Sequence, residues 1–139
     1  MSGGKKLPVS EVMSQLPKSP FRADILNGRV VLITGGATGI GYAIAETFGL
    51  HGCKVAIMSR RRQVIMDAVV KLRAVGIDAF GTTVDVRDAD RCVAAVNEVA
   101  QHFGRIDFLV NNAAGNFMTS AENLTPNGFA TVLGIDLQG

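Results

Sequence analysis

Four short apolar runs recur along the chain, at residues 30–33, 55–58, 79–84 and 106–110. Each has the length and the mainly apolar character of a strand buried on both faces. Between the runs, apolar residues return at every third or fourth position, which is the period of one helix face. The predicted faces carry Ile40, Ile44 and Phe48 in the first helix, Val64, Ala68, Leu72 and Val75 in the second, and Val93, Val96, Ala100 and Phe103 in the third.

Strands that alternate with helices predict βαβ units and a parallel sheet, because a right-handed crossover is the favoured connection between such strands. The expected fold class is therefore α/β, a Rossmann-like doubly wound sheet truncated after its fourth strand. A last helix is expected to open at Thr125 and Pro126, a hydroxyl cap followed by proline, and to run to Gly139. Such a sheet would expose an apolar edge and leave the last helix half covered, so we expect the sequence to be the N-terminal part of a longer protein.

Composition narrows the class of protein. Residues 1–20 mix Gly, Lys, Ser and Pro without periodicity, so we expect an arm over 1–20 and one domain over 21–139. A net charge of +2 without a long basic run argues against a nucleic-acid partner. No apolar run approaches the roughly 20 residues of a membrane-spanning helix, so no membrane association is predicted. Cys53 and Cys92 form no C-x-x-C pair, which favours reduced thiols over a disulfide or a metal site.

The first predicted strand runs into a glycine-rich segment, TGGATGIG at residues 34–41, in front of a helix. A turn of this kind places free backbone N–H groups and the positive end of the helix dipole where a phosphate can lie. Glycine is needed because a Cβ would block the turn or the approach of a pyrophosphate. A mononucleotide P-loop requires lysine where this chain has Tyr42, so a P-loop is excluded. The usual dinucleotide fingerprint G-x-G-x-x-G is not matched either, because the spacing here is G-x-x-x-G-x-G after Thr34. A glycine-rich turn without a ligand is the alternative.

The residues after the second strand indicate which dinucleotide to expect. A fold that prefers NAD places Asp or Glu about 20 residues beyond the glycines, where it binds the ribose 2′-hydroxyl. This chain has Arg60, Arg61 and Arg62 there, and guanidinium groups bind a 2′-phosphate that a carboxylate would repel. We therefore predict NADP(H) as the cofactor. The alternative is that these arginines only solvate a helix start, although cations are slightly unfavourable at that end.

Three motifs together resemble the short-chain dehydrogenase/reductase family: T-G-x-x-x-G-x-G at residues 34–41, Asp85 with Val86 after the third strand, and NNAAG at residues 111–115 after the fourth. Within that family, CKVAIMSR (53–60), VDVR (84–87), FGRID (103–107), AAGNF (113–117) and Ile135 with Asp136 are similar to the 2,4-dienoyl-CoA reductases, the peroxisomal type in particular. The resemblance extends from about residue 19 to residue 139. It implies a homo-oligomeric enzyme of the peroxisome, with the cytoplasm as the alternative location.

The resemblance also implies roles for individual residues. Asn111 and Ala113 would line the nicotinamide side, and Asp85 with Val86 would contact the adenine. From the residues alone, Asn111 could equally bridge neighbouring strands, and Asp85 could be a helix cap. By the same resemblance the pyrophosphate is bound by Gly35, Gly36, Ala37, Thr38, Gly39, Ile40 and Gly41, and the adenosine ribose phosphate is surrounded by Arg60, Arg61, Arg62, Gln63 and Val64.

The reaction implied by the resemblance is the reduction of a 2,4-dienoyl-CoA. NADPH delivers hydride to the δ-carbon, the dienolate is protonated at the α-carbon, and the product is a 3-enoyl-CoA of unsaturated fatty acid β-oxidation. Such a fatty acyl-CoA needs cationic contacts for its phosphates and an apolar slot for its acyl chain. The candidates are Arg60 and Arg87 for the phosphates and, by resemblance, Phe117, Thr125, Pro126 and Asn127 for the acyl-CoA, with Phe117 as core filler the alternative.

Asp136 lies about three turns into the last predicted helix, where most short-chain reductases carry an asparagine that holds a water for the proton relay. A carboxylate can hold the same water and also pass a proton through it, so the resemblance makes Asp136 the candidate catalytic residue. Spacing alone favours an ordinary exposed aspartate. By the resemblance the remaining reactive residues lie beyond the fifth strand, so the 139 residues alone are expected to be inactive. A generic short-chain carbonyl reductase and a non-catalytic NADP-binding protein are the alternatives.

Overall fold

The structure, a computed structural model, describes residues 19–115 and 119–139. Its four strands form one parallel sheet in the order β3-β2-β1-β4, which confirms the predicted Rossmann-like α/β class. The expected arm falls almost wholly outside the described residues, as does Phe117. The strands are β1 (Val30–Thr34), β2 (Lys54–Ser59), β3 (Ala79–Thr83) and β4 (Phe108–Val110); the helices are α2 (Gly39–Leu50), α3 (Arg62–Ala74), α4 (Ala89–Phe103) and α5 (Pro126–Asp136), with a short 3-10 helix η1 (Ala121–Asn123) before α5.

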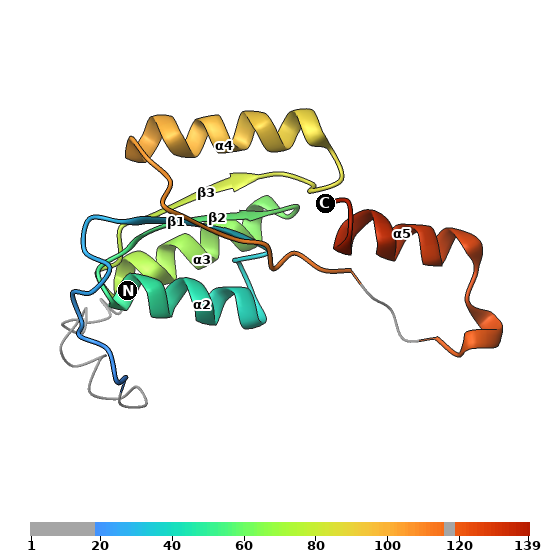
Figure 1. The fold of residues 1–139 in the computed structure, drawn as a ribbon, viewed down its shortest axis with the longest axis horizontal. Helices are drawn as coiled ribbons and strands as arrows, with labels where there is room; N and C mark the ends of the chain where they lie inside the picture. Colours follow the sequence, from blue (N-terminus) through green and yellow to red (C-terminus); the bar gives the residue numbers. More distant parts are fainter. Residues whose placement is uncertain (1–18, 116–118) are drawn as a thin grey trace, which may run out of the picture.

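The sheet is covered on both faces. Figure 1 shows α4 on one face, α2 and α3 on the other, and α5 beyond the carboxyl ends of the strands. The alternation along β1 explains the two layers, because Val31 and Ile33 belong to the cluster packed by α2 and α3, whereas Leu32 belongs to the cluster packed by α4. All three side chains are at most 2% exposed, as expected of a strand buried on both sides.

Parallel pairing gathers the ends of the strands at one edge of the sheet. Thr34 at the end of β1 is in register with Met58 of β2, and Ser59 is in register with Thr83 of β3. The loops after β1, β2 and β3 therefore leave the sheet side by side. β4 pairs with the other side of β1, where Val110 is in register with Ile33. The loop after β4 consequently emerges beside the glycine-rich loop.

Two of the predicted helix faces are wrong in part. Ile40 is 76% exposed, because the first turn of α2 borders a cavity and does not lie over the sheet. In α4 the buried side chains are Ala95 and Val99, whereas Val93 and Val96 are exposed. Apolar residues occupy two adjacent faces of α4, and the face with the small Ala95 can approach the sheet more closely.

The apolar edge expected from the sequence is present. Among the described residues β4 pairs only with β1, and its central residue Leu109 is 59% exposed. Phe129 of α5 is 55% exposed, so the last helix is indeed incompletely covered. The helix ends at Asp136 and does not run to Gly139 as expected, because the N–H groups of the next two residues both bond to the carbonyl oxygen of Leu133 and close the last turn. No helix in the described ranges has the length and apolar character needed to cross a bilayer.

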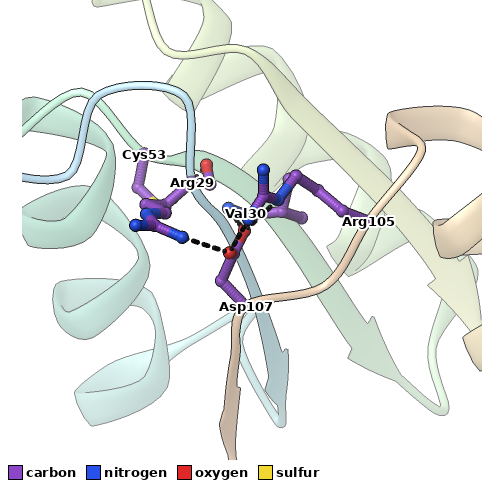
Figure 2. A network of polar contacts seen from close by, with 5 residues as sticks. All are labelled: Arg29, Val30, Cys53, Arg105 and Asp107. Carbon is purple, nitrogen blue, oxygen red and sulfur yellow. Dashed lines mark hydrogen bonds and ion pairs between the residues drawn. The ribbon is translucent and has the colours of Figure 1, made fainter.

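Asp107 joins the starts of β1 and β4 at the opposite edge of the sheet. Figure 2 shows its carboxylate between two arginines and the backbone of β1. It accepts hydrogen bonds from Arg29 at 2.9 Å, from Nε of Arg105 at 2.8 Å and from the N–H of Val30 at 2.9 Å. The hydrogen bond from Arg105, together with those from Val30 and Arg29, lowers the pKa of Asp107 to about 2.

Cys53 lies beside this network, directly before β2 (Figure 2). Its side chain is buried, and its thiol donates a weak hydrogen bond to the carbonyl oxygen of Arg29 at 3.3 Å. Burial raises the pKa of the Cys53 thiol to about 11. The other cysteine, Cys92, is only partly buried and lies in the first turn of α4.

Candidate functional site

The loop between β1 and α2 approaches the loop after β4 so closely that it needs glycine. Gly35 has φ +66° and Gly39 has φ +55°, both in the left-handed region. A Cβ on Gly41 would clash with the carbonyl oxygen of Gly35 and would lie 2.5 Å from Nδ2 of Asn112. Nothing lies within 4 Å of a Cβ built on Gly39. The loop is thus tightly packed on its inner side and open on its outer side, which is the geometry that a pyrophosphate requires.

Thr34 and Asn112 fasten these two loops together. Thr34 Oγ1 accepts hydrogen bonds from the backbone N–H groups of Asn112 and Ala113, both at 3.0 Å. Asn112 Nδ2 donates to the carbonyl oxygen of Thr34 at 3.0 Å. The bridge considered for Asn111 is therefore made by Asn112, because successive residues of an extended segment point in opposite directions and Asn111 is exposed.

A cavity of about 350 Å³ lies at the carboxyl ends of the strands. The sequence motifs identified much of its lining but not all of it. The predicted cofactor residues that line it are Gly35, Thr38, Ile40, Gly41, Arg60, Arg61, Asp85, Val86 and Ala113. The lining residues that were not predicted are Met58, Ser59, Val84, Asn112, Ala114 and Ile135. Met58, Ser59, Val84, Asn112 and Ala114 lie at or just after the ends of strands, and that position is the signal that could have found them. Ile135 lies in α5, so no strand end indicates it.

Some predicted cofactor residues are not brought to this cavity. A Cβ on Gly36 would lie 2.7 Å from the side chain of Ile57, and Ala37 and Val64 pack with the core, so these positions serve the fold. The side chain of Gln63 donates to that of Asp67 at 2.9 Å, one helical turn along α3. The predicted cofactor residues outside the lining are Gly36, Ala37, Gly39, Arg62, Gln63, Val64 and Asn111.

Arg60 and Arg61 stand where β2 passes into α3. Neither side chain makes an ion pair with another described residue. Arg61 is the N-cap of α3, makes no side-chain capping hydrogen bond, and is followed by a first turn without acidic residues. The charge of Arg60 interacts with that of Asp85, but this carboxylate is bonded to Arg87. Two cations beside the positive end of a helix dipole therefore leave an excess of positive charge, which favours an anion in the cavity.

Asp85 and Arg87 form an ion pair at the end of β3. Arg87 donates through Nε to Asp85 Oδ1 at 3.0 Å and through Nη2 to Asp85 Oδ2 at 2.6 Å. These bonds lower the pKa of Asp85 to about 2 and raise the pKa of the Arg87 guanidinium. The cap of α4 is Asp88, whose Oδ1 accepts from the N–H of Arg91 at 3.0 Å, so the alternative of Asp85 as a helix cap is wrong.

The last helix is attached to the site through Gly115. Asp136 Oδ1 accepts a hydrogen bond from the N–H of Gly115 at 2.8 Å, and Ile135 packs so closely that a Cβ on Gly115 would clash with it. Asp136 is exposed, and its Oδ2 makes no hydrogen bond to another described residue. One oxygen of this carboxylate is therefore held by the loop after β4 while the other is available.

The start of α5 is as predicted. Thr125 is the N-cap, its Oγ1 accepts from the N–H of Gly128 at 3.0 Å, and Pro126 is the first residue of the helix. The helix rises about 1.5 Å per residue, so Thr125, Pro126 and Asn127 lie roughly 15 Å from Asp136 at its other end. They do not line the cavity, and neither does Arg87.

Comparison with known proteins identifies similar sequences. Residues 29–139 match the family model described as short chain dehydrogenase. The peroxisomal 2,4-dienoyl-CoA reductase of Arabidopsis thaliana is 54% identical over 121 residues, which are 87% of this chain and 41% of the relative. This chain thus spans about two fifths of the length of that relative.

Solved structures share the fold. The 3-ketoacyl-(acyl-carrier-protein) reductase of Brucella melitensis, complexed with NADH, is 30% identical with a TM-score of 0.74, over 81% of this chain and 46% of that chain. A variant of the actinorhodin polyketide ketoreductase with NADPH is 32% identical with a TM-score of 0.74, over 77% of this chain and 41% of that chain. One structure holds NADH and the other NADPH, so this fold accommodates either dinucleotide.

Proposed function

The chain belongs to the short-chain dehydrogenase family, and on that premise we propose that it forms the cofactor-binding part of an NADPH-dependent reductase of 2,4-dienoyl-CoA thioesters. The observation that carries the proposal is the cavity at the strand ends, bordered by the glycine-rich loop and by two arginines without an ion-pair partner among the described residues. The identity of 54% to a relative named as a 2,4-dienoyl-CoA reductase supports the substrate class.

The choice of NADP(H) rests on Arg60 and Arg61. A dinucleotide that lies with its pyrophosphate at the glycine-rich loop has its adenosine ribose near the end of the neighbouring strand β2. A 2′-phosphate at that ribose would meet two guanidinium groups and the N-terminus of α3. Within the cavity lining, the acidic side chain is Asp85, and it is already paired with Arg87.

In the proposed reaction, residues of this chain bind and orient the cofactor and protonate the dienolate. When bound, NADPH supplies the hydride that adds to the δ-carbon of the dienoyl-CoA. Thr34 and Asn112 hold the pyrophosphate loop against the loop after β4. Asp136, fixed through Oδ1, holds a water at Oδ2 and passes a proton through it to the α-carbon, which yields the 3-enoyl-CoA.

The acyl-CoA is assigned to residues around the cavity mouth and along α5. Arg60 is the candidate for the CoA phosphates, whereas Arg87 can serve them only if its pair with Asp85 opens. Thr125, Pro126 and Asn127 at the start of α5 contact the acyl-CoA in this proposal, together with Phe117, which lies outside the described residues. The protein is further proposed to act as a homo-oligomer in β-oxidation of unsaturated fatty acids. A peroxisomal location is proposed as well, in keeping with the name of the Arabidopsis relative.

The cofactor assignment is tested by Arg60→Ala in a full-length enzyme that contains this chain. The loss of a charge-assisted hydrogen bond to the 2′-phosphate should raise the Michaelis constant for NADPH by about tenfold or more and leave that for NADH nearly unchanged. Arg62→Ala is the matched control, because Arg62 does not line the cavity. Equal effects of Arg60→Ala on both cofactors would show that the guanidinium does not recognise the 2′-phosphate.

A carbonyl reductase is the second candidate, because the Brucella reductase and the actinorhodin ketoreductase are both named as reductases of keto groups. Oxidation of NADPH with a 2,4-dienoyl-CoA and with a 3-ketoacyl thioester separates the two functions. The proposed function requires a 3-enoyl-CoA product that is identified by mass spectrometry. Turnover of the ketone alone would assign the protein to the carbonyl reductases, and cofactor binding without turnover of either would leave a non-catalytic NADP-binding protein.

A further inference from the structure

We propose that Arg87 is a positioning residue, which fixes the Asp85 carboxylate so that the cavity selects dinucleotides of adenine over those of a 6-oxopurine. The inference rests on the proposed function, because it requires a dinucleotide whose base lies beside Asp85. It assigns Arg87 to the cofactor side of the site and not to the CoA phosphates.

The order of the strands puts the base at Asp85. Along the carboxyl edge of the sheet, the glycine-rich loop follows β1, Arg60 follows β2 and Asp85 follows β3, and these strands are direct neighbours in the order β1-β2-β3. Pyrophosphate, ribose and base are joined in the same order in a dinucleotide. A ligand with its pyrophosphate at the glycines and its ribose at Arg60 therefore carries its base to Asp85, and all three positions line one cavity.

The hydrogen bonds from Arg87 leave Asp85 little freedom. Oδ1 accepts two of them, from the backbone N–H of Arg87 at 3.1 Å and from Nε at 3.0 Å. Oδ2 accepts one, from Nη2 at 2.6 Å. A carboxylate offers about four lone-pair sites, so one acceptor position remains, on Oδ2. The bidentate hydrogen bonds from the Arg87 guanidinium fix the direction in which this remaining lone pair of Oδ2 points. They also keep the carboxylate ionised, since the pKa of Asp85 is about 2.

An ionised carboxylate held in one direction distinguishes purines by their position 6. Adenine presents an amino group there, which donates to the remaining site on Oδ2. Hypoxanthine presents a carbonyl oxygen, which the carboxylate repels. Hypoxanthine does carry a donor at N1, and a carboxylate that is free to turn could accept from it. Selectivity for adenine thus depends on the carboxylate being fixed, which is what Arg87 provides.

The experiment compares dissociation constants of NADPH and of its hypoxanthine analogue, reduced nicotinamide hypoxanthine dinucleotide phosphate, by calorimetry. The unmodified protein should bind NADPH about tenfold more tightly than the analogue, as expected for a hydrogen bond to a charged group. Arg87→Gln should reduce that ratio to about threefold or less, mainly by weakening NADPH. Arg87→Lys should restore it in part, because lysine keeps the charge but cannot grip both oxygens.

A double-mutant cycle and a matched control distinguish positioning from general structural loss. In an Asp85→Asn background, Arg87→Gln should leave the ratio unchanged, since the carboxylate that it positions is gone. Arg91→Gln also removes an exposed cation near the start of α4, and it should leave both the ratio and the thermal unfolding midpoint unchanged. Arg87 is partly exposed, so Arg87→Gln should unfold at nearly the same temperature.

The outcomes separate this inference from the proposed function. If the unmodified protein binds neither dinucleotide, the proposed function fails and the inference fails with it. If it binds NADPH but the ratio is the same in Arg87→Gln, the inference alone is overturned. A third result is that Arg87→Gln leaves the ratio unchanged and weakens the binding of CoA more than that of 3′-dephospho-CoA. That result would show that Arg87 contacts the CoA phosphates and does not position Asp85.

Discussion

Asp107 holds two strands together with a single carboxylate, and this makes stability depend on pH. Its pKa is about 2 in the folded chain, below the value near 3.9 of an unfolded aspartate. A depressed folded pKa contributes stability that is fully present above the unfolded pKa and is lost as the pH falls through the folded pKa. We expect the free energy of unfolding to decrease from about pH 5 towards pH 2, and the decrease to be shallower in Asp107→Asn. Urea denaturation at a series of pH values measures both slopes.

Asp78 provides the control for this pH dependence. It faces Lys54 at 3.9 Å, and both side chains are largely exposed, so the pair is expected to contribute little. Asp78→Asn should therefore keep the slope of the unmodified chain. If Asp107→Asn also keeps that slope, the carboxylate does not hold the strands together in the way described.

Asp136 can be tested with two substitutions that differ in chemistry. In a full-length enzyme that contains this chain, Asp136→Ala and Asp136→Asn should both lower kcat by something like 10²- to 10⁴-fold, the usual effect of losing an acid or base. The Michaelis constant for NADPH should change little. Asparagine can still accept from the N–H of Gly115 but cannot pass a proton. Full turnover in Asp136→Asn would mean that the carboxylate only anchors the loop.

At the level of whole elements, the sequence predicted what periodicity and glycine spacing determine. β1 and β2 were recognisable because both of their faces are buried, and α5 because hydroxyl and proline mark its start. The buried face of α4 could not be predicted, since Val93 and Val96 are as apolar as the Ala95 and Val99 that pack on the sheet. Which of the two faces packs on the sheet depends on how closely α4 approaches the sheet, and this distance is set by tertiary packing.

The site follows the same division. Gly35, Gly41, Arg60 and Arg61 line the cavity, and their residue types pointed to them because they are tied to phosphate chemistry. That they bind phosphate stays a prediction. Asn112 was missed in favour of its neighbour Asn111, since the direction of alternate side chains depends on where pairing with β1 ends. Ile135 was missed because it comes from α5, and only the packing of α5 against Gly115 brings it to the cavity.

The glycine-rich loop allows a prediction about its packing. Gly41→Ala inserts a Cβ against the carbonyl oxygen of Gly35 and against Asn112, so the loop must move. Overpacking of this kind costs about 1–3 kcal/mol, and we expect NADPH affinity to fall by at least tenfold. Gly104→Ala is the control, because Gly104 has φ +79° at the end of α4 and open space around it. It should cost about 1 kcal/mol of stability and leave NADPH affinity unchanged. Urea denaturation and calorimetry give both quantities.

At the scale of the whole molecule, the cavity is built from the loops after every strand and from α5. A ligand that occupies it contacts all of these parts only when they are folded together. NADPH at 100 times its dissociation constant should stabilise the fold by about 2.7 kcal/mol, or roughly 8 °C in the unfolding midpoint. Differential scanning fluorimetry with NADPH and with NADH at equal concentration measures the effect. Equal shifts with the two cofactors would contradict the preference for NADP(H).

The rate at which the buried thiol of Cys53 is alkylated can measure how often the sheet opens transiently. A pKa of about 11 and a closed position beside Arg29 leave almost no reactive thiolate in the folded state, so an alkylating reagent can reach this sulfur only when the sheet parts. Cys92, only partly buried, should be modified first. When opening and closing are fast, the rate at Cys53 divided by the rate of an unfolded cysteine gives the equilibrium constant for opening in plain buffer. Mass spectrometry of timed samples can therefore follow that constant as a dinucleotide is added, without any denaturant.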